Sequence, residues 1–166
     1  ALHLILSCWK DAVAAGGKDA WKKHALEFLR ASNYAGIAFG HAGCAAVHAM
    51  AYPLGGVHHI PHGQANQLMF ADVMRKYQEK KPIGKLNQLE ELLGAELDVE
   101  PVFSLENLYK LMDEVLKKDP LHEHGVTADE LPIFAKNVIE TQQRLLGNNY
   151  VELSEDDLLD IYRKAF

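Results

Sequence analysis

Apolar residues recur along this chain with the three-to-four-residue period of an α-helix, and this pattern limits the possible folds more than any other feature. No segment shows the sustained alternation of apolar and polar residues that a half-buried strand requires. The sequence therefore predicts an all-α, multi-helix domain. The predicted helices cover residues 1–15, 20–31, 34–52, 64–80, 84–93, 105–118, 132–146 and 155–166.

Stop and start signals separate these helices. We expect the first helix to end at Gly16-Gly17 and the third at Pro53, which two glycines follow. Thr127 begins a capping box, and Ser154 caps the last helix, whose first turn is acidic. Two apolar stripes are predicted to be core: Leu105, Leu108, Leu111, Met112 and Val115, and Leu158, Leu159, Tyr162 and Phe166.

Charge and cysteine content exclude several classes of protein. The formal net charge is −6, with acidic and basic residues interspersed, so no basic patch is available for nucleic acid or an anionic membrane. Cys8 and Cys44 lie in apolar stretches and form no disulfide framework. We therefore expect a cytoplasmic protein that acts on a small molecule.

No charged residue occurs between Tyr34 and Val57, a length sufficient to cross a membrane. Alanine and glycine dominate this stretch, which contains two histidines and lacks basic flanks. We therefore expect a buried helix packed through its small residues.

The chain starts within an apolar run, Ala1 to Leu6, that has no cap before it, and it shows no signal peptide. This start predicts a piece of a longer protein.

Histidines gather in one region of the sequence. Five of the nine fall close together: His41, His48, His58, His59 and His62. On the predicted helix over 34–52, one face carries a polar line made of His41, Cys44, His48 and Tyr52. Pro53 stops this helix, and a loop over 54–61 lets the chain return, so that His62 at the next helix start lies opposite His48.

Two facing neutral imidazoles are suitable ligands for a metal ion. A helix N-terminus disfavours imidazolium, which keeps the lone pair of His62 available. The alternative is a group of hydrogen-bonded core or surface histidines. Asp72 and Asp19, the nearest carboxylates, have no matching spacing, so we expect the remaining ligands outside this chain.

The segments 43–56 and 61–66 resemble the signature of the iron-containing alcohol dehydrogenases, and the resemblance extends over the entire chain. It implies that His48 and His62 bind the catalytic metal. It also implies that residues 1–166 are the all-helical C-terminal half of the dehydroquinate synthase-like fold. The absent N-terminal α/β domain would bind NAD(P) and supply an Asp and a His ligand. We expect Fe²⁺, with Zn²⁺ as the alternative, and a homo-oligomer such as a homodimer.

Two positions depart from the family pattern. Tyr52 stands where many members carry a histidine near the nicotinamide, and His41 replaces a frequent asparagine. Residues 47–55 resemble the 4-hydroxybutyrate dehydrogenase subgroup, which implies 4-hydroxybutyrate and succinic semialdehyde as substrates. The resemblance further suggests Tyr52 or His59 as proton relay, Tyr52 beside the cofactor, and Phe39 and His41 in the substrate pocket.

Each residue also has a plainer interpretation, and so does the chain. Tyr52 is then a buried hydrogen-bonded phenol, His41 packs beside small residues, and His58, His122 and His124 are solvated loop residues. The alternative functions are another alcohol or diol dehydrogenase of the family, with glycerol dehydrogenase and dehydroquinate synthase relatives ranked lower, and a non-catalytic helical domain that binds metal or mediates association. The isolated chain is expected to be inactive and to bind metal weakly, because it lacks the cofactor domain.

Overall fold

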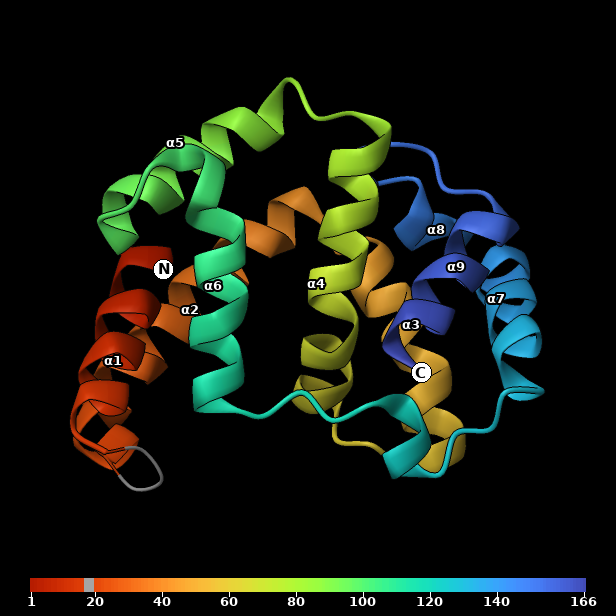
Figure 1. Cartoon of the computed structure of the whole chain (residues 1–166), viewed down its shortest axis with the longest axis horizontal. Helices are drawn as coiled ribbons and strands as arrows, with labels where there is room; N and C mark the ends of the chain where they lie inside the picture. The colour runs from red at the N-terminus through yellow and green to blue at the C-terminus, as the bar shows by residue number, and fades with distance from the viewer. Residues whose placement is uncertain (17–19) are drawn as a thin grey trace. The chain divides into compact units, whose positions relative to one another are not determined.

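The computed structural model describes residues 1–16 and 20–166, which form helices and no strand. The elements in chain order are α1 (Leu2–Ala14), η1 (Ala20–His24), α2 (Ala25–Ala42), α3 (Ala46–His58), α4 (His62–Lys80), α5 (Lys85–Leu97), α6 (Pro101–Val115), η2 (Leu121–His124), α7 (Glu130–Thr141), α8 (Gln143–Leu146) and α9 (Glu155–Ala165). Figure 1 shows them coloured along the chain. The prediction of an all-α fold is confirmed.

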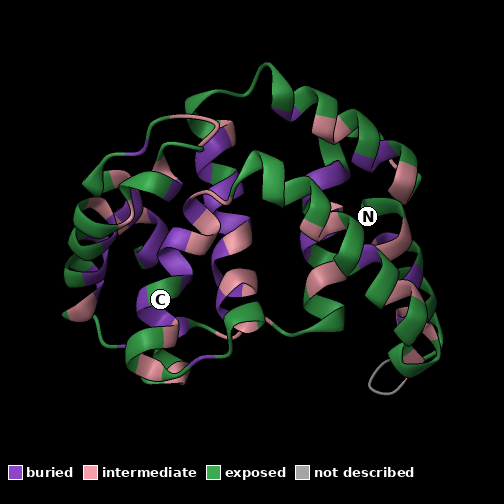
Figure 2. Cartoon of the chain, turned by 180° about the vertical axis from the view of Figure 1, so that it is seen from behind, coloured by how far each residue is buried: buried purple, intermediate pink, exposed green. Residues whose placement is uncertain are grey.

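The chain divides into two compact units, and each unit is built from two separate segments. Unit 1 comprises Ala1–Ala42 and Ile83–Lys117, and unit 2 comprises Gly43–Pro82 and Lys118–Phe166. The backbone therefore passes from one unit to the other three times. Figure 2 shows that burial differs between the helices: α4 carries many buried residues, whereas α2 is mostly exposed or intermediate.

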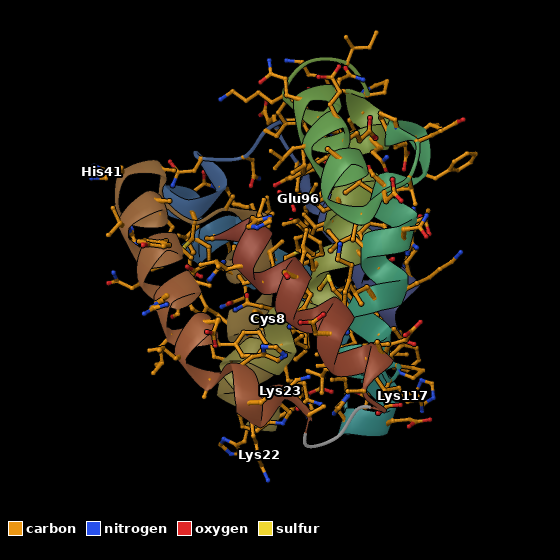
Figure 3. The ribbon with its side chains drawn as sticks, turned by 90° about the vertical axis from the view of Figure 1, so that its left-hand side faces the viewer. Cys8, Lys22, Lys23, His41, Glu96 and Lys117 are labelled. Atoms are coloured by element: carbon orange, nitrogen blue, oxygen red, sulfur yellow. The ribbon has the colours of Figure 1, made fainter. Side chains whose placement is uncertain are left out.

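Unit 1 packs α1 against α2, α5 and α6, and α5 and α6 lie side by side (Figure 1). The imidazole of His3 meets the Glu96 carboxylate at 2.8 Å, and the Lys10 ammonium donates to the Glu96 carbonyl oxygen at 2.6 Å, so this end of α5 is fastened to α1 (Figure 3). The buried side chains of this unit include Leu6, Cys8, Ala12, Ala31, Leu86, Leu93, Leu105, Leu108 and Tyr109.

Unit 2 pairs α3 with α4, and α9 packs against both α4 and α7. Tyr162 of α9 is completely buried, and its hydroxyl donates to the carbonyl oxygen of Met50 in α3 at 2.7 Å. Burial raises the pKa of Tyr162, so the phenol keeps its proton and remains a donor. The core of this unit is formed mainly by Ala49, Met50, Leu54, Leu68, Met69, Val73, Phe134, Val138, Leu158 and Ile161.

Ion pairs reinforce the contact between α4 and α9. The buried ammonium of Lys76 lies 2.6 Å from an oxygen of Asp160 and 3.0 Å from one of Glu79. The hydrogen bonds from Lys76 and Lys164 hold the pKa of Asp160 below its usual value. One turn away, Lys80 pairs with Asp157 at 2.5 Å. These charged groups fix the register of α4, the helix that begins at His62.

The prediction of one helix over 34–52 is wrong. Helix α2 starts before this range and ends at Ala42, and α3 starts at Ala46, so His41 and His48 lie on different helices and in different units. Gly43 adopts a left-handed conformation with φ of +76°, which breaks the helix between them. Most of the 34–42 stretch is also exposed rather than buried, with Ile37 at 58% and Phe39 at 55%.

Pro53 does not end α3, contrary to the prediction, and the expected loop over 54–61 is reduced to residues 59–61. Proline cannot donate to the carbonyl of Ala49, but Pro53 and Leu54 are both buried, and this packing offsets the lost bond. The helix ends at His58; the next residue, His59, is left-handed with φ of 55°, and the Ile60 N–H donates to the Leu54 carbonyl oxygen at 3.5 Å.

Several other boundaries shift by a few residues. Helix α5 continues through Gly94, α6 already starts at Pro101, and a short break separates α7 from α8 within the helix predicted over 132–146. The helices predicted over 1–15 and 155–166 agree with α1 and α9, whereas the one over 20–31 is η1 followed by the longer α2. The capping box at Ser154 is present, but the one predicted at Thr127 is not complete: Asp129 is the N-cap of α7, and the Thr127 N–H and hydroxyl both donate to the Glu130 carboxylate. Of the stop at Gly16-Gly17, Gly17 lies outside the described residues.

Within the part of the chain that the structure describes, no helix is long and apolar enough to cross a membrane.

Candidate metal centre

The imidazoles of His48 and His62 face each other within unit 2. His48 is the third residue of α3 and His62 the first residue of α4, and three residues, 59–61, connect the two helices. Their ring centroids are 5.3 Å apart with the planes tilted by 52°. The spacing predicted this juxtaposition, although it assumed a longer loop.

The surroundings of His48 keep it neutral. Partial burial lowers the pKa of His48, and repulsion from a positive His62 lowers it further. At neutral pH the ring therefore has a lone pair to donate. Two adjacent imidazoles, one of them poorly able to accept a proton, fit a divalent transition-metal ion as a ligand pair.

Tyr52 stands one helical turn after His48 and stacks on His62. The two ring centroids are 6.3 Å apart and the ring planes differ by 24°. The Tyr52 side chain is 44% exposed, so the interpretation as a buried phenol is wrong. The phenol instead lies at the surface beside the histidine pair, where it is accessible to a ligand.

Asn66 also belongs to this group, although no role was expected for it from the sequence. The Nδ2 of Asn66 lies 3.0 Å from the Nε2 of His62, one turn along α4, while its Oδ1 is buried without a hydrogen-bond partner. The four-residue separation on one helix face was the available signal. Asn66 lies four residues after His62, but no role was predicted for it from this spacing.

The remaining residues of the predicted site lie elsewhere. Phe39 and His41 are exposed on α2 of unit 1, with His41 at the end of that helix (Figure 3). His59 is an exposed residue at the C-terminus of α3. Their proposed roles in substrate binding and proton transfer stay predictions.

The interpretation of His58 as a solvated loop residue is wrong. His58 is the last residue of α3, is half-buried, and meets the Glu130 carboxylate at 3.1 Å. Glu130 also accepts from the backbone and hydroxyl of Thr127, and these bonds, with His58, lower the pKa of the carboxyl. His58 thus connects α3 to the start of α7. His124 is likewise half-buried, whereas His122 is exposed.

Among residues 1–16 and 20–166, no group of three or more His, Cys, Asp or Glu side chains is arranged to hold a metal ion. Asp72, the carboxylate nearest in sequence to the histidine pair, is buried and pairs with Lys118 and Arg75. The described residues therefore bring together two candidate ligands, His48 and His62, whose metal-binding role stays a prediction.

Comparisons with known proteins identify the family of the chain. A model of the C-terminal region of the Fe-containing alcohol dehydrogenase family matches residues 1–166. The chain is 42% identical to 4-hydroxybutyrate dehydrogenase of Clostridium kluyveri over 166 residues, which are 100% of this chain and 44% of that protein. It is 33% identical to long-chain-alcohol dehydrogenase 1 of Geobacillus thermodenitrificans, covering 100% of this chain and 42% of that protein.

The fold agrees as well. The crystal structure of a 1,3-propanediol oxidoreductase superposes with a TM-score of 0.75 at 26% identity, over 99% of this chain and 43% of the other. The chain belongs to the iron-containing alcohol dehydrogenase family and corresponds to its C-terminal, all-helical part. It spans less than half the length of the relatives it matches.

Proposed function

We propose that the protein carrying this chain is a metal-dependent alcohol:NAD(P) oxidoreductase that interconverts 4-hydroxybutyrate and succinic semialdehyde. The observation that carries the proposal is the facing pair His48 and His62 in a chain of this family. The choice of substrate is supported by the 42% identity to a relative of that name.

In this proposal residues 1–166 are the metal-binding C-terminal domain. An N-terminal domain would bind NAD(P) and supply the other metal ligands. The metal is Fe²⁺, with Zn²⁺ as a competitor that binds imidazole at least as well. A cytoplasmic homo-oligomer, such as a homodimer, without nucleic-acid or membrane partners completes the proposal.

The bound cation would act as a Lewis acid on the substrate oxygen, while the alcohol gives its hydride to NAD(P)⁺ and its proton to solvent. His48 and His62 would hold the ion through neutral imidazoles. Tyr52, stacked on His62 and exposed, would contact the cofactor or substrate and pass on the proton, with His59 as the second candidate for that relay. Phe39 and His41 would line the substrate pocket.

A second candidate is another alcohol dehydrogenase of the same family. Identities of 33% to a long-chain-alcohol dehydrogenase and 27% to the lactaldehyde reductase of Escherichia coli support it. A non-catalytic metal-binding or association domain has no comparable support, since these three relatives are all named as dehydrogenases or reductases.

The test is NADH oxidation by the full-length protein with Fe²⁺, using succinic semialdehyde, lactaldehyde and butyraldehyde in parallel. We expect fast turnover with the semialdehyde, lost in His48→Ala and retained in His3→Ala. His3 is a matched control because it is an exposed histidine of unit 1 that pairs with Glu96. Turnover with only the uncharged aldehydes would show that the proposed substrate is wrong while keeping the proposed dehydrogenase activity. No metal-dependent turnover with any of the aldehydes would refute the proposed oxidoreductase activity.

A further inference from the structure

Helix α3 starts without a capping side chain of its own. Its N-cap residue is Ala45, which offers no acceptor, so the amides of the first turn find no partner from their own segment. His48 lies in this first turn, whereas Tyr52 lies one turn deeper. The position of His48 therefore depends on whatever satisfies the start of α3.

A residue more than 100 positions away supplies the missing acceptor. The Oδ1 of Asn149, in the segment between α8 and α9, accepts from the Ala46 amide at 2.8 Å and from the Tyr77 hydroxyl at 2.9 Å. Tyr77 is buried on α4, and burial raises its pKa to about 12, so its hydroxyl remains a donor at neutral pH. The Asn149 oxygen thus bridges the start of α3 and α4.

The preceding residue strengthens this contact. The side-chain Nδ2 of Asn148 donates to the Cys44 carbonyl oxygen at 2.9 Å. A Cβ at Gly43 would come within 2.5 Å of the Asn148 nitrogen, so only glycine fits in the turn. Residues 43–46 are therefore held from one side by two adjacent asparagines.

We propose that Asn149 is a positioning residue for the metal ligand His48, acting as the remote N-cap of α3. This inference rests on the proposed function, because it requires His48 to bind metal. Without the Asn149 oxygen, the first turn of α3 frays more readily, since the Ala46 amide loses this acceptor. His48 then leaves its place opposite His62, while the deeper turns of α3 remain packed in the core.

The chemistry of Asn149 suggests a conservative variant. Its Nδ2 is buried without a hydrogen-bond partner, so only the oxygen contributes to the contact. Asn149→Asp keeps the acceptor, and a carboxylate at a helix N-terminus is favourable. Asn149→Ala removes the acceptor altogether.

The chain also offers a matched control at another helix start. The Oδ1 of Asn87 accepts from the Gly84 amide at 2.8 Å at the beginning of α5 in unit 1. Asn87→Ala removes the same kind of bond, of the same length, from a helix that carries no predicted metal ligand. It separates loss of helix stability from displacement of His48.

The test is a Zn²⁺ titration of the 166-residue chain and its variants, followed through the imidazole NMR signals of His48 and His62, with urea unfolding in parallel. We expect Asn149→Ala to weaken Zn²⁺ binding about tenfold or more, as loss of outer partners of metal ligands does. Asn149→Asp should stay within about threefold of the wild type, and Asn87→Ala should lose stability but not affinity. Should Asn149→Ala not fold, Asn149→Gln, which displaces the oxygen by one methylene, takes its place with the same expectation.

The outcomes that overturn the inference are distinct from those that overturn the metal site. Unchanged Zn²⁺ affinity in Asn149→Ala, an equal loss in Asn87→Ala, or no rescue in Asn149→Asp would each reduce Asn149 to a structural residue. If His48→Ala leaves the titration unchanged, the metal ligand itself is wrong and the proposed function loses its site.

Discussion

At several positions one small group, a tyrosine hydroxyl or the hydrogen side chain of a glycine, contributes to the stability of the fold. Tyr162 is the clearest case, since its buried hydroxyl donates to the Met50 carbonyl. Tyr162→Phe leaves the ring in place but removes the donor, so we expect the free energy of unfolding to fall by about 1–2 kcal/mol. Urea unfolding monitored by circular dichroism measures the change.

The control for this substitution is Tyr34→Phe, which removes a hydroxyl from an exposed ring on α2. It should leave the unfolding free energy within about 0.5 kcal/mol of the wild type. Equal effects of the two substitutions would show that the bond to Met50 contributes nothing.

For two glycines within helices, we expect substitution by alanine to change the stability in opposite directions. A Cβ at Gly94 would lie 2.9 Å from the Val99 carbonyl oxygen and 3.2 Å from the Pro101 Cα, and this backbone cannot move aside easily. Gly94→Ala should cost about 1–3 kcal/mol. Gly40 of α2 has nothing within 4 Å of its Cβ position, so Gly40→Ala should raise stability by up to about 1 kcal/mol. Thermal unfolding should therefore move in opposite directions, and a shared direction would contradict the argument.

At the residue scale, local signals could be read from the sequence and distant ones could not. Ser154 and Asp157 are three residues apart and form a capping box. His48 and His62 lie on consecutive helices that are joined by a short connection. Both arrangements follow from spacing. The partner of Ala46 is Asn149, and no periodicity relates positions 103 apart.

The pairing of α4 with α9 makes the stability of unit 2 depend on pH. The pKa of Asp160 is lowered in the folded state by Lys76 and Lys164, so its stabilisation is complete above the unfolded pKa of about 4. It is lost as the pH falls through the lower folded pKa. The pair is partly exposed, and we expect a contribution of about 0.5 kcal/mol.

The measurement is urea unfolding of wild type and Asp160→Asn between pH 7 and pH 3. The difference between the two proteins should be constant at neutral pH and should close as the pH falls below about 4. Glu91→Gln, at a carboxylate on the surface of α5, is the control and should show no such difference. A gap between wild type and Asp160→Asn that persists at low pH would mean that the charge of Asp160 is not responsible.

At the element scale, helix content was predictable and helix continuity was not. The predicted helix over 34–52 joined α2 and α3 because alanine and glycine continue through the break with no proline or cap. The left-handed Gly43 is stabilised by Asn148, whose contact appears only in the folded chain. Conversely, Pro53 indicated an end to the helix, but the burial of the proline outweighs the bond that it cannot make.

For the whole molecule, the main expectation concerns activity of the chain by itself. It covers 44% of the length of a curated relative, and its described residues contain no group of three or more His, Cys, Asp or Glu side chains that could hold a metal ion. We expect the purified 166-residue chain not to oxidise NADH with succinic semialdehyde, and to bind divalent metal only weakly, because water must fill the rest of the coordination sphere. Measurable NADH turnover, or submicromolar metal binding by calorimetry that is lost in His48→Ala, would show that a further ligand lies in this chain.

Each unit combines one segment from the first half of the chain with one from the second half. This arrangement affects how the chain folds during synthesis and how its units can be produced separately. Residues 1–42 are synthesised before residues 83–117, with which they pack, and residues 43–82 are synthesised before residues 118–166, with which they pack. Their apolar surfaces therefore stay uncovered during much of translation, when chaperones have access to them. Neither unit can be produced by truncating the chain at one position. To express one unit alone, its two segments have to be joined by an engineered linker.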